Sequence, residues 1–152
     1  MSNIETRIQE LGITIPDITV PLANYIPAKR IGNIVYTSGH ICALGDKVFK
    51  GKIGRDIDTE KGKEAAKIAA INCLGAVKQL MGNLDCIKQV VAVHGLVSSD
   101  PDFTEQGVVM NGASDLMVAL FGEAGKHTRT AAGIACLPFD FSISVYIIVE
   151  VE

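Results

Sequence analysis

The feature that most constrains this fold is the C-terminal segment Ser142–Val151, in which apolar residues return at every second position. The repeating residues are all β-branched: Ile143, Val145, Ile147, Val149 and Val151. An alternation with a period of two predicts a β-strand that turns one face toward a core. The rest of the chain must therefore supply partner strands and a layer that covers this face.

A second strand is predicted over Arg129–Cys136, with a turn over Leu137–Asp140 between the two strands. Its first residue, Arg129, is unusual because it begins an otherwise apolar strand, where an unpaired buried charge would be costly. A guanidinium binds a carboxylate through two parallel hydrogen bonds, so a carboxylate ligand is one possible partner. The alternative is a solvated charge or a surface ion pair, which would contribute little to stability.

Two long helices are predicted from the spacing of apolar residues. One runs from Asp58 or Thr59 to about Met81, and the other from about Thr104 to Phe121. Between them, the nearly continuous apolar run Ile87–Ser98 predicts a central, covered strand. A short amphipathic helix is predicted over Asn3–Leu11.

A hairpin is predicted from the strands Asn24–Lys29 and Asn33–Ser38, with Arg30, Ile31 and Gly32 at its turn. Tyr25 lies on the first predicted strand, and Gly39 directly follows the second. Gly39 would let a backbone N–H approach a ligand closely, or it could only mark a bulge or a strand end. Tyr25 could contact a ligand, although a packing role with a satisfied hydroxyl is more common for a tyrosine.

The order of elements predicts an α+β fold: a two-layer sandwich of a mixed β-sheet with two helices on one face, in a single domain over residues 1–152. A short edge strand is predicted within Lys47–Ile53. The open face of the sheet is predicted to carry apolar residues that no third layer covers, so we expect an oligomer. These residues include Val35, Val91, Val93, Ala132 and Ile148.

Composition excludes several classes of function. Lys and Arg number 14 and Asp and Glu 17, a net charge of −3 with no basic run, which argues against a nucleic-acid surface. The four cysteines form no C-x-x-C pair, and no metal-ligand spacing joins the three histidines, so no metal is expected. We find no apolar leader and no run long enough to span a bilayer. We therefore expect a cytoplasmic protein with reduced thiols and no membrane partner.

Three segments resemble one known family. They are NYIPAKRIGNIVYTSGHI (Asn24–Ile41), VMNGASDLMVALFGEAGKHTRTA (Val109–Ala131) and RTAAGIACLP (Arg129–Pro138). Together they resemble the Rid proteins, also called the YjgF or L-PSP family, in a branch with longer loops. The resemblance implies a chorismate-mutase-like fold and a homotrimer with a ligand cleft between neighbouring subunits. It also implies hydrolysis of reactive α-imino or enamine acids to α-keto acids and ammonia, without a metal or organic cofactor.

The resemblance also implies roles for individual residues. Arg129 matches the arginine that binds the substrate carboxylate. Tyr25, Ser38 and Gly39 match the tyrosine and the backbone that line the opposite side of the cleft. Asn111 matches a helix asparagine near the site. The small carboxylate-bearing metabolite and the second copy of the chain are thus the expected partners.

Two residues depart from the pattern of the active deaminases. Ser144 stands where they carry a glutamate that helps to hold the attacking water, and Ala131 stands where they often carry a cysteine. Ser144 can hold a water through hydrogen bonds but cannot act as a carboxylate base. His40 or Glu150 could substitute for that base. The departure leaves a second hypothesis open, a non-enzymatic module that binds keto acids or protects proteins. An endoribonuclease is less favoured because the chain has no basic groove.

Overall fold

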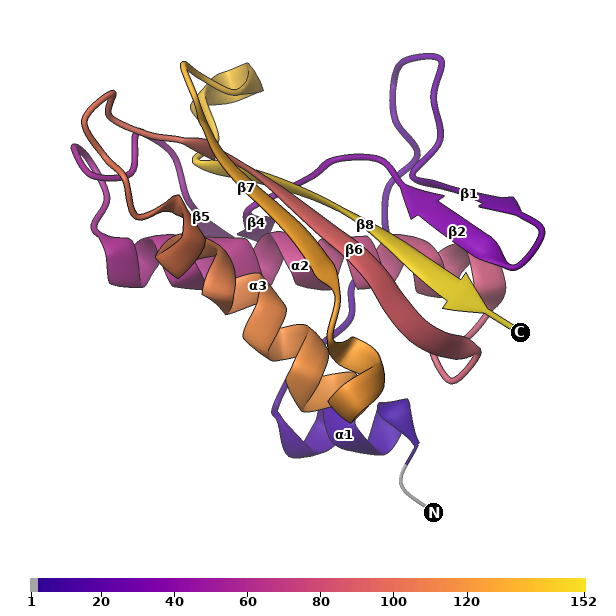
Figure 1. Ribbon diagram of the computed structural model, residues 1–152. Helices are drawn as coiled ribbons and strands as arrows, with labels where there is room; N and C mark the ends of the chain where they lie inside the picture. Colours follow the sequence, from indigo (N-terminus) through magenta and orange to yellow (C-terminus); the bar gives the residue numbers. More distant parts are fainter. Residues whose placement is uncertain (1–2) are drawn as a thin grey trace.

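The structure is a computed structural model that describes residues 3–152, and its main body is a six-stranded sheet with two long helices against it (Figure 1). The α-helices of the described residues are α1 (Ile4–Glu10), α2 (Thr59–Met81) and α3 (Gln106–Phe121). Short 3₁₀ helices are η1 (Gly122–Gly125) and η2 (Pro138–Asp140). The strands are β1 (Ala28–Ile31), β2 (Ile34–Thr37), β3 (His40–Ile41), β4 (Ala43–Leu44), β5 (Lys47–Val48), β6 (Ile87–Ser98), β7 (Thr128–Ile134) and β8 (Ile143–Val151).

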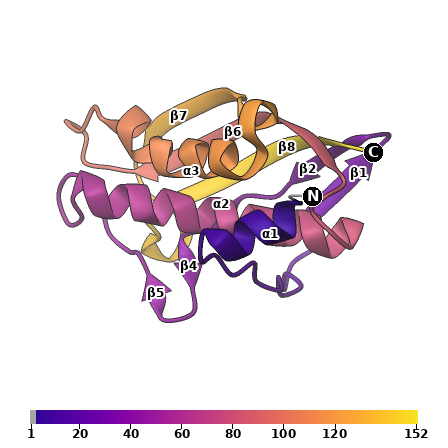
Figure 2. The same cartoon turned by 90° about the horizontal axis from the view of Figure 1, so that it is seen from below.

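The sheet is mixed, with strand order β1-β2-β8-β6-β7, and β3 also pairs with β8. Strands β6 and β7 run parallel, whereas the other pairs of this sheet are antiparallel. Helices α2 and α3 contact one another and lie on the same side of the sheet (Figure 2). The predicted α+β architecture, with two main helices on one face, is therefore confirmed. The hairpin β1–β2 and strand β7 occupy opposite edges of the sheet.

The core lies between the sheet and the two helices α2 and α3. All five β-branched residues of the predicted alternation in β8 are completely buried, which confirms the predicted inner face of this strand. The prediction that Val35 and Val93 lie on the open face is wrong, because Val35 pairs with Val149 and Val93 pairs with Ile147 in the buried layer. Both faces of these strands carry apolar residues, so the sequence pattern does not show which face packs against the helices.

Local signals set the ends of α2. The Asp58 carboxylate accepts a hydrogen bond of 2.8 Å from the backbone N–H of Lys61, as an N-cap does. At the other end, Gly82 adopts φ +91° and donates its N–H to the Lys78 carbonyl at 2.7 Å. The predicted bounds of this helix are confirmed.

The first strand of the hairpin differs from the prediction. β1 begins at Ala28, so Tyr25 lies in the loop before the strand rather than on it. Pro27 has no N–H to donate to a ladder, which explains why pairing does not extend further toward the N-terminus. The turn also shifts: Arg30 and Ile31 belong to β1, and Gly32 turns the chain with φ +60°.

The face of the sheet that the helices leave uncovered carries aromatic and apolar side chains. Tyr36 and Tyr146 are 46% and 37% exposed, and the Tyr146 ring stacks on His94 with ring centroids 4.6 Å apart. Ile148 and Ala132 share this face, as predicted. Within residues 3–152, no helix is both long and apolar enough to cross a membrane.

Candidate functional site

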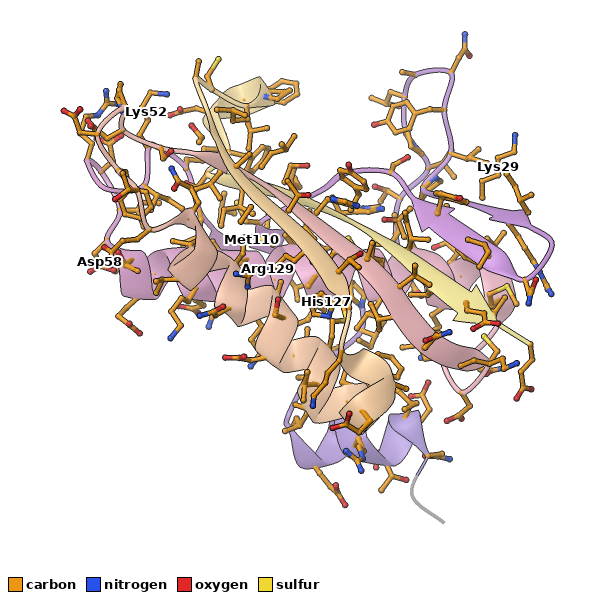
Figure 3. All side chains as sticks on the ribbon, in the orientation of Figure 1. Lys29, Lys52, Asp58, Met110, His127 and Arg129 are labelled. Carbon is orange, nitrogen blue, oxygen red and sulfur yellow. The ribbon has the colours of Figure 1, made fainter. Side chains whose placement is uncertain are left out.

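Arg129 lies near the start of β7 and turns its side chain toward α3, as Figure 3 shows. Its Nη1 donates to the Asn111 Oδ1 at 2.8 Å and to the Ser114 Oγ at 3.2 Å. Both hydrogens of Nη1 are thereby used, since a guanidinium carries two hydrogens on each terminal nitrogen. Within residues 3–152, the Nε and Nη2 of Arg129 donate to no other group, and no ion pair involves this residue. The free edge of the fork is thus the Nε–Nη2 edge.

Helix α3 leaves space beside that free edge. A Cβ built on Gly107 would lie 3.3 Å from the Arg129 Nη2, so a side chain at this position would crowd the guanidinium. Arg129 is exposed in the single chain. Of the alternatives drawn from the sequence, the single chain therefore shows the solvated charge: the guanidinium is exposed, it donates to two neutral oxygen acceptors, and no ion pair within residues 3–152 involves it.

Ser114 and His127 extend the cluster around Arg129, and the sequence reasoning missed both. The Ser114 Oγ lies 2.9 Å from the His127 Nε2, and the His127 Nδ1 lies 2.6 Å from the Gly125 carbonyl oxygen. A partial signal was present, because Ser114 follows Asn111 by three residues and therefore shares its helix face. Nothing in the sequence, however, shows that His127 folds back onto that face.

A hollow of about 400 Å³ lies away from Arg129. Four of the predicted site residues line it: Tyr25, Ser38, Gly39 and Ser144. Ser144 and Gly39 are in contact there: a Cβ built on Gly39 would lie 2.7 Å from the Ser144 hydroxyl oxygen. Phe139 also lines the hollow, with φ +57° and 83% of its surface exposed. The hollow is thus lined mostly by apolar residues, among which Ser38, His40 and Ser144 are polar.

The loop that carries Tyr25 is fixed to the end of β2 by Ser38. The Ser38 hydroxyl donates to the Ile26 carbonyl at 2.6 Å, and its N–H donates to the Pro27 carbonyl at 2.8 Å. Tyr25 is 58% exposed. Ser38 therefore positions the tyrosine loop, and its hydroxyl hydrogen is not free to donate to a ligand.

His40 lies in this hollow, whereas Glu150 does not. The His40 Nε2 lies 3.3 Å from the Pro27 carbonyl. Because a carbonyl only accepts, Nε2 carries the hydrogen and Nδ1 keeps its lone pair in the neutral ring. Burial lowers the pKa of His40 below its ordinary value, although the bond to Pro27 opposes this shift. Glu150 instead accepts a hydrogen bond of 2.6 Å from Gln89 near the far end of β8.

The structure brings the predicted residues together in two groups rather than one. Arg129 and Asn111 meet on the helix side of the sheet, while Ser144 points to the uncovered side, where it meets Gly39. Arg129 pairs across the sheet with Val93, whereas Ser144 pairs with Leu96. Within one chain, the Arg129–Asn111 pair and the hollow therefore do not face each other.

No group of three His, Cys, Asp or Glu side chains within residues 3–152 is arranged to hold a metal ion. Ala131, which stands in place of the family cysteine, pairs with Gly95 in the parallel ladder of β6 and β7. Neither group of site residues contains a thiol.

Comparison with known proteins identifies the family. The model of the YjgF/chorismate mutase-like family, whose description also names endoribonuclease, matches residues 5–151. The chain belongs to this family. Its sheet and its two main helices thus form the chorismate-mutase-like fold that the sequence resemblance implies.

Individual relatives agree with this assignment. Protein TCP17 of Trypanosoma cruzi is 35% identical over 152 residues, covering 98% of this chain and 94% of that protein. The crystal structure of protein Atu1372 from Agrobacterium tumefaciens, whose function is unknown, superposes with a TM-score of 0.88 at 42% identity, over 98% of this chain and 94% of that one. Escherichia coli TdcF, solved with bound serine, has a TM-score of 0.61 at 16% identity, over 88% and 92% of the two chains, which shows a shared fold.

Proposed function

We propose that this YjgF-like protein hydrolyses short reactive α-imino acids, and the enamine acids that tautomerise to them, to α-keto acids and ammonia. The observation that carries the proposal is the state of Arg129. Its Nη1 is anchored by Asn111 and Ser114, and its Nε–Nη2 edge has no partner among residues 3–152. Such an edge matches the two oxygens of a carboxylate, and the anchor fixes its direction before the ligand arrives. The serine bound to the relative TdcF carries an α-carboxylate of this kind.

The chemistry needs orientation, a placed water and proton transfer. The imine carbon is already electrophilic, so the reaction calls for no metal or organic cofactor. Water adds its oxygen to that carbon, and one of its protons reaches the nitrogen, which gives a carbinolamine. The hydroxyl proton of the carbinolamine then passes to the nitrogen as the C–N bond breaks, which leaves the keto acid and ammonia. We assign the water to the Ser144 hydroxyl and its deprotonation to the His40 Nδ1, because both residues line the hollow. The lowered pKa of His40 keeps this nitrogen unprotonated at neutral pH.

The proposal requires a second copy of the chain. Arg129 and Asn111 lie on one side of the sheet and Ser144 on the other, so a cleft with both groups forms only between subunits. Exposed aromatic side chains at the hollow and on the uncovered face, among them Tyr25, Phe139 and Tyr36, offer apolar surface for such a contact. A homotrimer and a cytoplasmic location both stay predictions.

A second candidate is a binding module without catalysis. One observation favours it: none of the described residues that line the hollow is Asp or Glu, so no carboxylate base stands next to Ser144. In this case Arg129 would bind a keto acid, and the protein would sense or sequester it. An endoribonuclease is the least favoured candidate, since the chain carries a net charge of −3.

The deciding experiment is keto-acid release from α-imino acids generated in situ, with wild type, Arg129→Lys and Arg129→Ala compared. Deaminase activity predicts acceleration by wild type and a loss of at least about 100-fold in kcat/KM for Arg129→Ala, because two charge-assisted hydrogen bonds disappear. Lysine keeps the charge but not the fork, so Arg129→Lys should fall between the two. No acceleration by wild type, combined with keto-acid binding that Arg129→Ala abolishes, would establish the binding module instead.

A further inference from the structure

The structure assigns a positioning role to Ser114 and His127: together they hold the Arg129 guanidinium in the direction that leaves its Nε–Nη2 edge open to a carboxylate. The inference deepens the proposed function. Only its affinity test rests on that function, because that test assumes that the protein binds a keto acid. Neither residue is a site residue in the sequence resemblance. Ser114 belongs to α3, and His127 directly precedes β7, the strand that carries Arg129.

Arg129, Ser114, His127 and Gly125 are linked by a series of hydrogen bonds, and the Gly125 carbonyl fixes the direction of each of them. The Gly125 carbonyl oxygen can only accept, so the His127 Nδ1, 2.6 Å away, must carry the hydrogen. In the neutral ring, Nε2 then holds a lone pair and accepts the hydroxyl hydrogen of Ser114 at 2.9 Å. The Ser114 oxygen, with its hydrogen turned toward His127, offers its lone pairs to the Arg129 Nη1 at 3.2 Å. Each bond in the sequence Arg129, Ser114, His127, Gly125 therefore runs in one direction.

Arg129 needs such an anchor because of where it stands. β7 is an edge strand, and the Arg129 side chain is exposed, so strand packing alone does not fix its rotamer. A free arginine side chain loses substantial conformational entropy when it must hold one geometry. A ligand that finds the guanidinium already oriented avoids most of that cost. With Asn111 as its only acceptor, the guanidinium could rotate about that one hydrogen bond. Ser114 accepts a second hydrogen bond, which restricts this rotation.

A purely structural reading of His127 is that it caps the Gly125 carbonyl at the end of η1 and does nothing for Arg129. The two readings differ in which ring nitrogen matters. Capping uses the Nδ1–H bond to Gly125, whereas positioning uses the Nε2 lone pair that faces Ser114. An asparagine at this position keeps a donor near Nδ1 but no acceptor near Nε2, and a glutamine keeps an acceptor near Nε2. The pair of variants therefore separates the two roles.

The first test needs no activity. ¹⁵N NMR of histidine-labelled protein at neutral pH should show His127 protonated on Nδ1 and unprotonated on Nε2. His40 provides the internal control, because its Nε2 donates to Pro27 and it should show the opposite tautomer. The Arg129 Nε–H should be ordered on the picosecond–nanosecond timescale in wild type and mobile in Ser114→Ala and His127→Asn. An Nε2–H tautomer at His127, or an Arg129 side chain equally mobile in all variants, would overturn the inference.

The second test measures keto-acid affinity together with stability. We expect Ser114→Ala and His127→Asn each to raise the dissociation constant about tenfold, with kcat nearly unchanged and the thermal midpoint close to that of wild type. His127→Gln should keep an affinity within about twofold of wild type. Full affinity in His127→Asn, with a loss in His127→Gln, would show that the histidine only caps Gly125. If wild type binds no keto acid, the proposed function fails, and the tautomer and the Arg129 dynamics still decide this inference.

Discussion

Gly39 stands so close to Ser144 that a Cβ built on it would lie 2.7 Å from the Ser144 hydroxyl oxygen. The contact joins the residues after β2 to β8 in the lining of the hollow. Gly39 does not adopt a positive φ, so the glycine is required for space rather than for backbone conformation. This one contact therefore sets where the serine hydroxyl can point.

Gly39→Ala should displace the Ser144 hydroxyl and cost about 1–3 kcal/mol of stability through overpacking. Keto-acid binding should weaken in the same variant. In a Ser144→Ala background the hydroxyl is absent, so the cost of Gly39→Ala should nearly disappear. Urea denaturation of the four proteins in a double-mutant cycle measures the coupling. A cost that is the same in both backgrounds would mean that the two residues do not meet.

Asn111 offers a test of how the guanidinium is held. Asn111→Asp keeps an oxygen acceptor 2.8 Å from the Arg129 Nη1 but adds a negative charge that competes with a ligand carboxylate. Asn111→Ala removes one hydrogen bond and leaves the positive charge. We therefore expect Asn111→Asp to weaken keto-acid binding more than Asn111→Ala, by about 100-fold against about tenfold. Calorimetric titration distinguishes them, and stronger binding by the aspartate variant would contradict the clamp.

His40 should set the acid side of the pH–rate profile. Burial lowers its pKa below the ordinary value of 6.5, so the ring is neutral at pH 7 and its lone pair is available. The rate should therefore hold as pH falls to about 6.5 and decline at lower pH as the ring is protonated. His40→Gln should lower kcat by about 100-fold and remove this acid limb. An acid limb that persists unchanged in His40→Gln would assign it to another group.

Much of the fold could be predicted because its signals are local. The alternation in β8, the Asp58 cap and the Gly82 end of α2 each depend on a few neighbouring residues. The face on which Val35 and Val93 lie could not be predicted, since it depends on register between strands far apart in sequence. A one-residue change of register exchanges the two faces of a strand.

The candidate site was less predictable than the fold. The family resemblance implies that Arg129 binds a carboxylate and that Asn111 lies near the site, but it does not give the hydrogen bond between these two side chains. The hydrogen bonds from Ser114 to its neighbours arise only because α3 lies against the start of β7. Arg129 and Ser144 are separated because their side chains lie on opposite faces of the sheet. The spacing of residues in the sequence does not show which face each side chain takes.

The close contacts of α3 with α2 and with β6 predict two stability changes of different size. A Cβ on Gly112 would lie 1.9 Å from the Lys63 backbone carbonyl oxygen, and a Cβ on Gly95 would lie 2.2 Å from the Met110 Sδ. A methionine side chain can move, whereas the backbone of α2 cannot. Gly95→Ala should cost about 1–3 kcal/mol and Gly112→Ala about 3 kcal/mol or more.

The Gly112 comparison is stringent because alanine is the better helix former by about 1 kcal/mol. Any net loss in Gly112→Ala therefore reports the steric contact between α2 and α3. Urea denaturation gives both free energies of unfolding, and the m-values should stay constant. Wild-type stability in Gly112→Ala would mean that the helices are further apart than described.

The buried thiol of Cys73 should make stability depend on pH on the alkaline side. Burial raises its pKa from 9.0 to about 12, and its Sγ donates to the Val145 carbonyl at 3.1 Å. The folded state therefore holds this proton more tightly than the unfolded state. Its contribution is complete below pH 9 and is lost as pH rises toward 12, at about 1.4 kcal/mol per pH unit within that window.

Cys73→Ala isolates this effect from the other groups that titrate in the same range. At pH 7 the variant should be less stable than wild type by about 1–2 kcal/mol, because it loses a buried sulfur and a hydrogen bond. The difference should shrink between pH 9 and 10.5, since wild type loses stability through the thiol and the variant does not. Urea denaturation across this range measures both proteins. A constant difference would mean that the Cys73 thiol titrates at its ordinary pKa in the folded chain.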